Sequence, residues 1–263
     1  LFLYYFGKGA KRLIYFVCAG SGAPELITVR GARLLSEADV IVYAGSLVNP
    51  ALLDYKKDGC EVYNSAKMTL EEVIAVMAPA AKAGKTVVRL HTGDPCVYGA
   101  HREQMDELDR LGLAYEVCPG VSSFCGAAAA LKAEYTLPNV SQSVILTRME
   151  GRTPVPEKEQ IEAFAAHGAT MVIFLSAGQL ARLSERLIAG GYAPDTPAAI
   201  VYKATWPDEK VVRTTVADLA EAGAREGITK TALITVGGFL GTEYERSKLY
   251  DPTFTTEFRE ASR

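Results

Sequence analysis

The chain is poor in the residues that build metal and disulfide sites. It has 5 cysteines and 3 histidines among 263 residues, and no two cysteines form a C-x-x-C pair. The thiols are odd in number and scattered, at Cys18, Cys60, Cys96, Cys118 and Cys125. This pattern indicates reduced cysteines in a cytoplasmic protein. We therefore expect no metal site, and we interpret Cys96 as a small buried thiol that lines a pocket.

The sequence also lacks a long apolar run and an excess of positive charge. No apolar run approaches the roughly 20 residues that span a bilayer. With 28 Lys and Arg against 31 Asp and Glu, the net charge is −3, whereas a nucleic-acid-binding protein normally carries a basic stripe. We expect neither a membrane nor a nucleic acid as partner. The apolar and then basic start is too short for a signal peptide, so residues 1–12 are expected to be an N-terminal extension.

Apolar residues, 49% of the chain, occur in short runs separated by helical patterns. Several runs are apolar at every position, which is typical of strands covered on both faces. We expect strands at 13–17, 40–43, 86–90, 143–147, 170–175, 198–202 and 232–236. Between them, apolar side chains recur at helical spacing, for example at Leu70, Val73, Ile74 and Met77. Thr69 and Glu72 form the signature of a capping box, and the alternation as a whole predicts an α/β fold.

The chain is long enough for two α/β domains of moderate size. The segment 133–142 breaks the periodicity and contains Pro138. We therefore expect an N-terminal α/β domain over 13–138 and a C-terminal α/β domain over 143–263. The latter ends in a polar tail after Gly241. A loop rich in proline and charge, 149–158, is expected at the rim of a cleft.

Glycine turns follow the strands of the first half and predict a small-molecule site. The most informative is HTGDPCVYGAHREQ (91–104), and further turns lie at 19–26 and 118–124. A strand, a glycine turn and a helix bring backbone close to a ligand at the carboxyl edge of a sheet. Asp94 supplies the carboxylate of the Gly-Asp-Pro turn in 91–104. It is a candidate for contact with a ligand or with the substrate, or it caps the following helix.

The first turn does not fit a dinucleotide-binding fingerprint. Gly20 and Gly22 follow a strand, but the third glycine of G-x-G-x-x-G is replaced by Glu25. A negative side chain there would oppose a pyrophosphate at the helix N-terminus. The second strand runs into Ala44 and Gly45 rather than an acidic residue. We therefore do not expect NAD as cofactor.

Four segments in order resemble the tetrapyrrole methylases, a family of enzymes that use S-adenosylmethionine (SAM). They are AGSGAPELITVRGARLLSEADVIVYAGSLV (19–48), TGDP (92–95), PGVSS (119–123) and VYKATWPDE (201–209). Each motif is weak alone, but together they cover nearly the whole chain from Leu13 to about Gly241. Further segments such as NSAKMTLEE and LTRMEGRTPVP are most similar to the branch that methylates C11 of a vitamin B12 precursor. The resemblance implies two α/β domains, with SAM in the trough between them, and a homodimer.

The resemblance also implies site residues. The cofactor-binding residues would be Ser21, Thr92, Gly93, Asp94, Val97, Ser122, Ser123, Ser176 and Ala204, and the substrate-binding residues would be Lys67, Tyr98 and Arg148. The chain departs from the family at Ser21 and Ala23, where Pro and Asp are usual. It also departs at Ala44 and Gly45, where some members have an acidic base. No catalytic residue can therefore be carried over, and Asp94 stays the candidate.

A tetrapyrrole substrate carries many carboxylate arms, so cationic side chains are expected to rim its site. The candidates are Lys67, Arg89, His91, Arg102, Arg148 and Lys203, and arginine suits bidentate recognition of carboxylates. Trp206 is either an apolar wall of the site or a core residue. Methyl transfer to a nucleophilic ring carbon requires alignment and exclusion of water rather than a nucleophilic side chain.

Other interpretations stay open at this point. Enzymes of the same fold methylate other precorrin carbons (C17 or C20), a modified histidine on a translation factor (diphthine synthase) or a ribose in ribosomal RNA. The RNA enzyme would need a basic face, which the composition does not indicate. A non-catalytic protein that binds SAM or a tetrapyrrole is a different class, and turnover would separate it from an enzyme. A Rossmann oxidoreductase would be identified by NAD binding.

Overall fold

The computed structural model describes residues 14–45 and 47–262 of the chain. The chain divides into two compact units, Leu1–Cys125 and Gly126–Arg263, and each is built on its own 5-stranded sheet. The extension expected at residues 1–12 lies outside the described residues. Among the helices that the structure describes, none is both long and apolar enough to cross a membrane.

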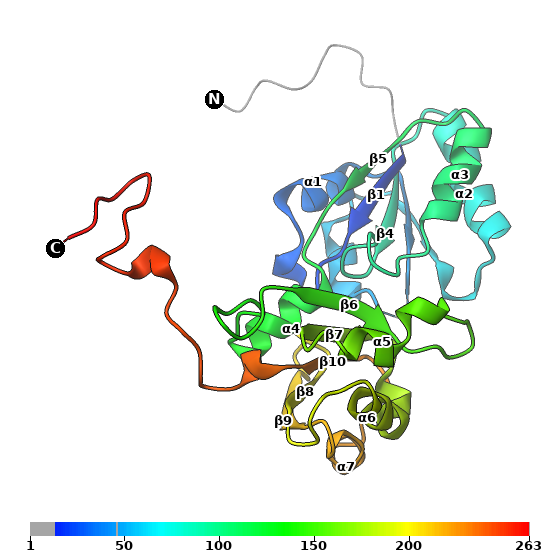
Figure 1. Cartoon of the computed structure of the whole chain (residues 1–263). Helices are drawn as coiled ribbons and strands as arrows, with labels where there is room; N and C mark the ends of the chain where they lie inside the picture. The colour runs from blue at the N-terminus through cyan, green and yellow to red at the C-terminus, as the bar shows by residue number, and fades with distance from the viewer. Residues whose placement is uncertain (1–13, 46, 263) are drawn as a thin grey trace. The chain divides into compact units, whose positions relative to one another are not determined.

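The first unit contains a parallel sheet with the strand order β3-β2-β4-β1-β5. Its strands are β1 (Ile14–Cys18), β2 (Val40–Tyr43), β3 (Glu61–Asn64), β4 (Val87–His91) and β5 (Tyr115–Cys118). Because all strands run in one direction, their carboxyl ends meet at one edge of the sheet (Figure 1). The turns after β1, β4 and β5 are neighbours there, since these strands are adjacent.

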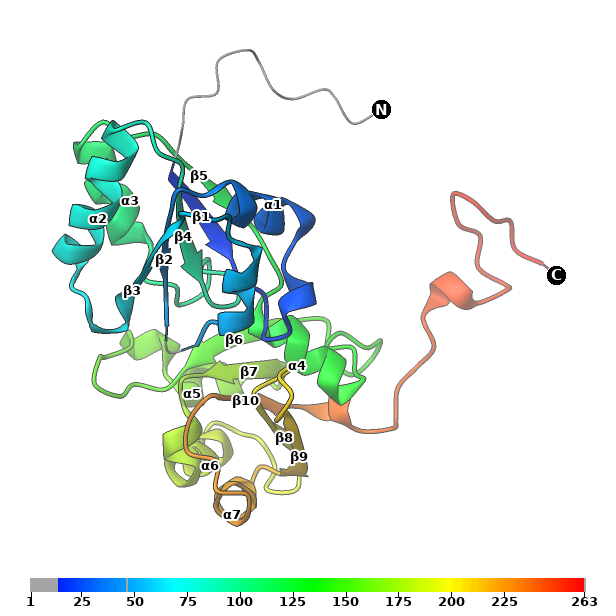
Figure 2. The ribbon, with the colours of Figure 1, turned by 180° about the vertical axis from the view of Figure 1, so that it is seen from behind.

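Helices cover both faces of this sheet. They are α1 (Val29–Glu37), α2 (Leu70–Lys82) and α3 (Arg102–Arg110). The next helix, α4 (Ser123–Leu131), follows β5 and continues into the second unit. One core joins α1 to the side chains of Val88 and Leu90. The opposite core joins α2 and α3 to Val87, and these two helices lie side by side (Figure 2). The capping box predicted at the start of α2 is confirmed, since the side chains of Thr69 and Glu72 each bond the other's backbone N–H.

The second unit contains a mixed sheet with the order β6-β7-β10-β8-β9. Its strands are β6 (Val144–Arg148), β7 (Thr170–Phe174), β8 (Pro197–Tyr202), β9 (Lys210–Thr215) and β10 (Ala232–Val236). Only β6 and β7 pair in parallel, and the other neighbours are antiparallel. A core of its own packs this sheet against α5 (Ile161–Ala165), α6 (Leu180–Ala189) and α7 (Leu219–Arg225) (Figure 1).

The α/β fold class is confirmed, and each predicted strand is present within about one residue of its expected bounds. The sequence did not predict β3, β5 and β9. These strands lie at sheet edges, and their burial patterns contain exposed residues. An edge strand is covered incompletely and carries polar side chains, so the apolar run that identifies a central strand is absent.

The boundary between the units falls between residues 125 and 126, inside α4, whereas the sequence pointed to the linker after residue 138. Hydrogen bonds explain this difference. Nη2 of Arg213 donates to the carbonyl of Leu131 at 2.9 Å. Oγ1 of Thr170 donates to the carbonyl of Tyr135 at 2.8 Å. The end of α4 and the segment after it are therefore attached to the second sheet.

Candidate functional site

Two glycines bring the turns after β1 and β4 into contact at the carboxyl edge of the first sheet. The N–H of Gly93 donates to the carbonyl of Gly20 at 3.0 Å. Both residues have positive φ, +80° at Gly20 and +59° at Gly93, a conformation that favours glycine. A Cβ on Gly20 would lie 2.9 Å from the carbonyl oxygen of Leu26. The first turn therefore requires glycine for its backbone and for space.

The turn after β5 joins them through Asp94. Oδ1 of Asp94 accepts from the N–H of Cys96 at 2.9 Å, and Oδ2 accepts from the N–H of Gly120 at 3.0 Å. Burial alone would raise the pKa of Asp94, but the hydrogen bonds from Gly120, Cys96 and Cys18 outweigh burial and leave the pKa below its usual value. Asp94 is thus an ionised side chain that links two turns, with both of its oxygens engaged by backbone.

The thiols beside Asp94 are poor nucleophiles. Burial and the neighbouring Asp94 carboxylate raise the pKa of the Cys18 thiol far above its usual value. A Cβ on Gly120 would lie 2.5 Å from Cβ of Cys18, so the third turn is packed directly on this residue. The interpretation of Cys96 as a buried thiol is wrong, because the residue is exposed. It is at a turn surface, where its hydrogen bond to Asp94 raises its pKa.

Thr92, Ser122 and Ser123 lie beside Gly93 and Asp94 at these turns. Oγ1 of Thr92 is buried with no hydrogen-bond partner among the described residues. A Cβ on Gly93 would lie 3.5 Å from the backbone N of Ser123 and 3.9 Å from Cα of Ser122. The turns therefore bring together Thr92, Gly93, Asp94, Ser122 and Ser123, as the resemblance implied. We define these five residues as the glycine-turn cradle.

The remaining candidates of the first unit lie around the cradle. Ser21 follows Gly20 and is 7% exposed. Val97 is half-buried, and Tyr98 is 45% exposed with φ of +56°. Lys67 is exposed on the 3-10 helix η3 (Ser65–Lys67).

Two cationic candidates are not at a rim. Arg89 and His91 are only 5% and 4% exposed, so they lie inside the first unit rather than at an exposed rim. Burial, with the nearby charge of Arg89, lowers the pKa of His91 to about 3. His91 is therefore neutral at physiological pH and stacks on Phe16 at 6.0 Å between ring centroids. Both side chains lie on the face of β4 that α2 and α3 cover, opposite Val88 and Leu90.

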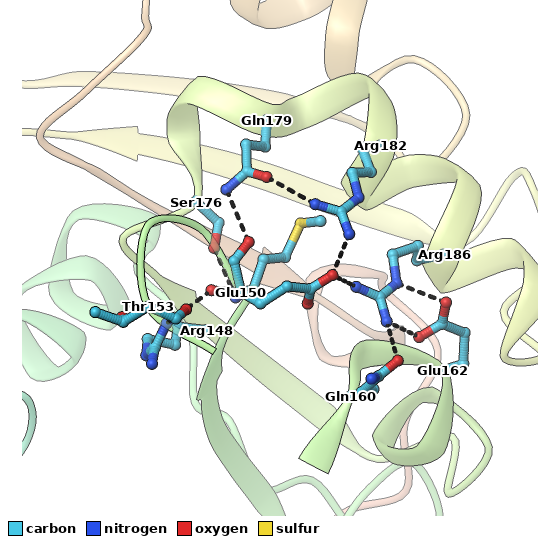
Figure 3. Close-up of polar contacts among 10 residues, drawn as sticks. Arg148, Glu150, Thr153, Gln160, Glu162, Ser176, Gln179, Arg182 and Arg186 are labelled. Atoms are coloured by element: carbon cyan, nitrogen blue, oxygen red, sulfur yellow. Dashed lines mark hydrogen bonds and ion pairs between the residues drawn. The ribbon is translucent and has the colours of Figure 1, made fainter. Parts of the chain in front are cut away.

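Ser176 and Ala204 belong to the second unit. The hydroxyl of Ser176 donates to the carbonyl of Phe174 at 2.7 Å and accepts from the N–H of Met149 at 3.0 Å. The side chain is fully buried, so it joins the ends of β6 and β7 (Figure 3). Ala204 is 7% exposed and stands between two residues with positive φ, Lys203 and Thr205.

Arg148 holds the loop that follows β6. Nη1 donates to the carbonyls of Met149 and Thr153 at 3.1 and 3.3 Å, and Nη2 donates to the carbonyl of Pro154 at 2.7 Å. Figure 3 shows the guanidinium beside Thr153. The sequence suggested this residue as a carboxylate ligand, but it did not show that the guanidinium shapes its own loop.

A network of charges on the other side of this loop was not foreseen. Arg186 of α6, 9% exposed, donates to both oxygens of Glu162 and to Glu150, and Arg182 also pairs with Glu150 (Figure 3). The partners are separated by 24 to 36 residues in sequence. Arg182 and Arg186 stand one helical turn apart, a pattern that usually marks a solvated face.

The other cationic candidates are engaged at the surface. Arg102 pairs with Asp106 at 2.8 Å on α3. Lys203 pairs with Asp208 at 2.5 Å, and its Nζ lies 5.5 Å from the centroid of the Trp206 ring. Trp206 therefore supports a cation–π contact. Among residues 14–45 and 47–262, no group of His, Cys, Asp and Glu has the arrangement of a metal site.

The glycine-turn cradle suits a ligand with a polar amino-acid end. Gly93 carries no side chain beside Ser122 and Ser123, and the buried hydroxyl of Thr92 has an unused hydrogen-bonding capacity that such a ligand would satisfy. The Asp94 carboxylate adds negative charge close to the turns. SAM, which is cationic and carries an amine, a carboxylate and ribose hydroxyls, fits this set of groups.

Comparison with known proteins agrees with the sequence and the fold. The family model described as Tetrapyrrole (Corrin/Porphyrin) Methylases matches residues 13–220. The chain is 55% identical over 252 residues to the cobalt-precorrin-4 C(11)-methyltransferase of Methanocaldococcus jannaschii, across 95% of this chain and 97% of the relative.

Solved structures give the same result. The X-ray structure of a cobalt-precorrin-4 methyltransferase, a cobalamin biosynthetic enzyme, is 48% identical with a TM-score of 0.87, across 90% of this chain and 99% of that one. The uroporphyrin-III C-methyltransferase of Thermus thermophilus, solved with S-adenosyl homocysteine, is 28% identical with a TM-score of 0.73, across 87% and 93%.

Proposed function

Because the chain belongs to the tetrapyrrole methylases, we propose that it transfers a methyl group from SAM to C11 of cobalt-precorrin-4 or of metal-free precorrin-4. The observation that carries this proposal is the 55% identity, over nearly the full length, to a cobalt-precorrin-4 C(11)-methyltransferase. The glycine-turn cradle supports it independently, since it combines a glycine turn with positive φ at Gly93 and an unpartnered buried hydroxyl at Thr92.

The cofactor would be held mainly by backbone. SAM, when bound, supplies an activated methyl group whose departure leaves a neutral thioether. Gly93 and Gly20 allow close approach, Thr92 offers its hydroxyl, and Ser122 and Ser123 line the side opposite Gly93. Ser21 and Val97 are proposed as further contacts. The solved relative with S-adenosyl homocysteine supports this choice of cofactor.

Asp94 acts as a positioning residue in this proposal. Its two oxygens fix the turns after β4 and β5 relative to each other. It therefore aligns the donors and acceptors around the methyl donor rather than moving a proton. The raised pKa of Cys18 keeps that thiol protonated, so it does not compete as a nucleophile for the methyl group.

In the second unit, Ser176 and Ala204 are proposed to contact the cofactor through backbone, because the hydroxyl of Ser176 is already used twice. Lys67, Tyr98 and Arg148 are proposed to bind the substrate. The guanidinium of Arg148 already donates to three loop carbonyls. A substrate carboxylate would accept from the N–H groups that these bonds leave unused. The alignment and exclusion of water that these groups provide suffice for attack by a nucleophilic ring carbon.

We also propose that the enzyme is a cytoplasmic homodimer without a nucleic-acid partner. The five cysteines are free thiols, which suits a reducing compartment, and the net charge of −3 gives no footprint for nucleic acid. Light scattering after size-exclusion chromatography measures the oligomer, and a mass of one chain would refute the dimer.

Cofactor choice is tested by calorimetric titration. SAM and S-adenosyl homocysteine should each give saturable heat, and NADH should give none, because Glu25 replaces the third glycine of the dinucleotide fingerprint. Binding of NADH, or no heat with either sulfur ligand, would overturn the proposal. Turnover with a tetrapyrrole then separates an enzyme from a carrier.

A further inference from the structure

A cavity of about 130 Å³ lies on the α2 and α3 side of the first sheet, outside the glycine-turn cradle. Its lining includes Ser65 of η3, Thr69 at the start of α2, and Glu103 and Gln104 at the start of α3. Arg89 of β4 forms its inner wall. The cavity has room for several water molecules, and therefore for a group as small as an acetate arm.

Arg89 is a buried cation without a counter-ion. Its residue is 5% exposed, and burial lowers its pKa only to about 10, so it stays charged at physiological pH. Nε donates to Oε1 of Gln104 at 2.9 Å, and Nη1 donates to the carbonyls of Val42 and Leu90 at 3.2 and 3.5 Å. Among the described residues, Nη2 has no partner and no carboxylate pairs with this guanidinium. Nη2 therefore faces the cavity, and a largely buried charge without a counter-ion favours an anion there.

The surrounding groups orient Arg89 and add positive potential. Gln104, itself 6% exposed, accepts from Arg89 and donates through Nε2 to the carbonyl of Ala100 at 3.0 Å, so the guanidinium is held by a fixed amide. The N-cap of α3, His101, makes no side-chain capping bond. The first N–H groups of α3 therefore add an uncapped helix N-terminus, which attracts anions.

One acid also lines the cavity. Glu103 is exposed and forms no ion pair with Arg89 in the described chain. Its charge opposes a bound anion without satisfying the buried guanidinium. Replacing it with a neutral isostere is therefore expected to improve anion binding, and this gives a variant that strengthens the site rather than weakening it.

We propose that this cavity binds one carboxylate arm of the tetrapyrrole substrate, held by Nη2 of Arg89 and the N-terminus of α3. The inference rests on the proposed function for the identity of the ligand. A carboxylate matches the fork of a guanidinium, and an acetate arm matches the volume. Lys67 ends the same 3-10 helix that supplies Ser65 to the lining, so a further cation stands beside the site.

The test uses the full chain and uroporphyrin III, a stable tetrapyrrole with acetate and propionate arms, with binding followed by fluorescence. Arg89→Met should weaken binding at least tenfold, Arg89→Lys should recover part of the loss, and Glu103→Gln should tighten binding about twofold. Arg110→Met removes an exposed arginine of α3, the helix that carries Glu103, and should have no effect on binding. Affinity for S-adenosyl homocysteine should not change in any variant.

A second arm separates a substrate arm from a free anion. Sodium acetate, compared with acetamide at constant ionic strength, should raise the Tm of the wild type and compete with uroporphyrin, but not in Arg89→Met. Unchanged uroporphyrin binding in Arg89→Met without any acetate effect would refute the carboxylate site and leave methyl transfer untouched. Arg89-dependent acetate binding with no affinity for any tetrapyrrole would overturn both the substrate assignment and the proposed function. If Arg89→Met fails to fold, the other two measurements still test the site. Unchanged uroporphyrin binding in Glu103→Gln, with no acetate effect on the wild type, would refute it.

Discussion

Substitution of single glycines distinguishes backbone strain from ligand contact at the carboxyl edge of the first sheet. Gly93 has φ of +59° and space for a Cβ at ordinary contact distance from Ser123. Gly93→Ala should therefore fold, with a loss of about 1–2 kcal/mol in unfolding free energy. The added methyl group fills the cradle, so affinity for S-adenosyl homocysteine should fall at least tenfold by calorimetry.

The matched control is Gly112→Ala. Gly112 has φ of +64° and nothing within 4 Å of its added Cβ, so this variant carries the same backbone strain away from the cradle. It should lose similar stability and keep its affinity for the cofactor product. Equal affinities in the two alanine variants would assign Gly93 a purely structural role.

The charge on Asp94 gives a prediction about pH. Because hydrogen bonds hold the folded-state pKa below its usual value, this carboxylate stabilises the fold above the unfolded pKa of about 3.9. The stabilisation is lost as the pH falls through the folded pKa. Asp94→Asn leaves one backbone N–H without an acceptor and should cost about 1–3 kcal/mol at neutral pH. Urea melts should show this difference shrinking below about pH 4, and a difference that grows toward acid would contradict the assignment.

At the scale of elements, α6 anchors the loop after β6. Arg186 donates to Glu150 and Glu162, so Arg186→Met should cost about 2 kcal/mol through lost charge-assisted hydrogen bonds. It should also speed hydrogen exchange in residues 149–156. Arg182→Met is the control. Arg182 is half exposed and, among the acids that the structure describes, pairs only with Glu150, so the variant should cost under about 1 kcal/mol. Equal losses in both variants would remove the anchoring role of Arg186.

The sequence predicts some elements and misses others, depending on what buries each element. Central strands such as β2 and β10 were predicted at their observed bounds because burial on both faces makes them apolar throughout. Glycine turns were predicted because positive φ needs glycine. The edge strands, the direction of Arg148 and the pairing of Arg186 were not predicted. Each depends on partners that only tertiary folding brings close. The local sequence around a polar residue does not identify such a partner.

At the scale of the whole molecule, each unit closes its own core. The main core cluster of the second unit is drawn from residues 149–236, and two core clusters of the first unit are drawn from residues 14–118. The α/β class could be read from the alternation of apolar runs and helical patterns, and the family from the order of four motifs. The unit boundary could not, because hydrogen bonds to Leu131 and Tyr135 attach the segment before the predicted linker to the second sheet.

Methyl transfer to C11 is tested by following the methyl group from the donor to the ring. The full chain is incubated with cobalt-precorrin-4 and SAM labelled with ¹³C in its methyl group, and the product is examined by carbon–proton correlation NMR. We expect one labelled methyl group per ring, attached at C11, with an equal amount of S-adenosyl homocysteine formed. A label at C17 or C20, or no transfer to the ring, would contradict it.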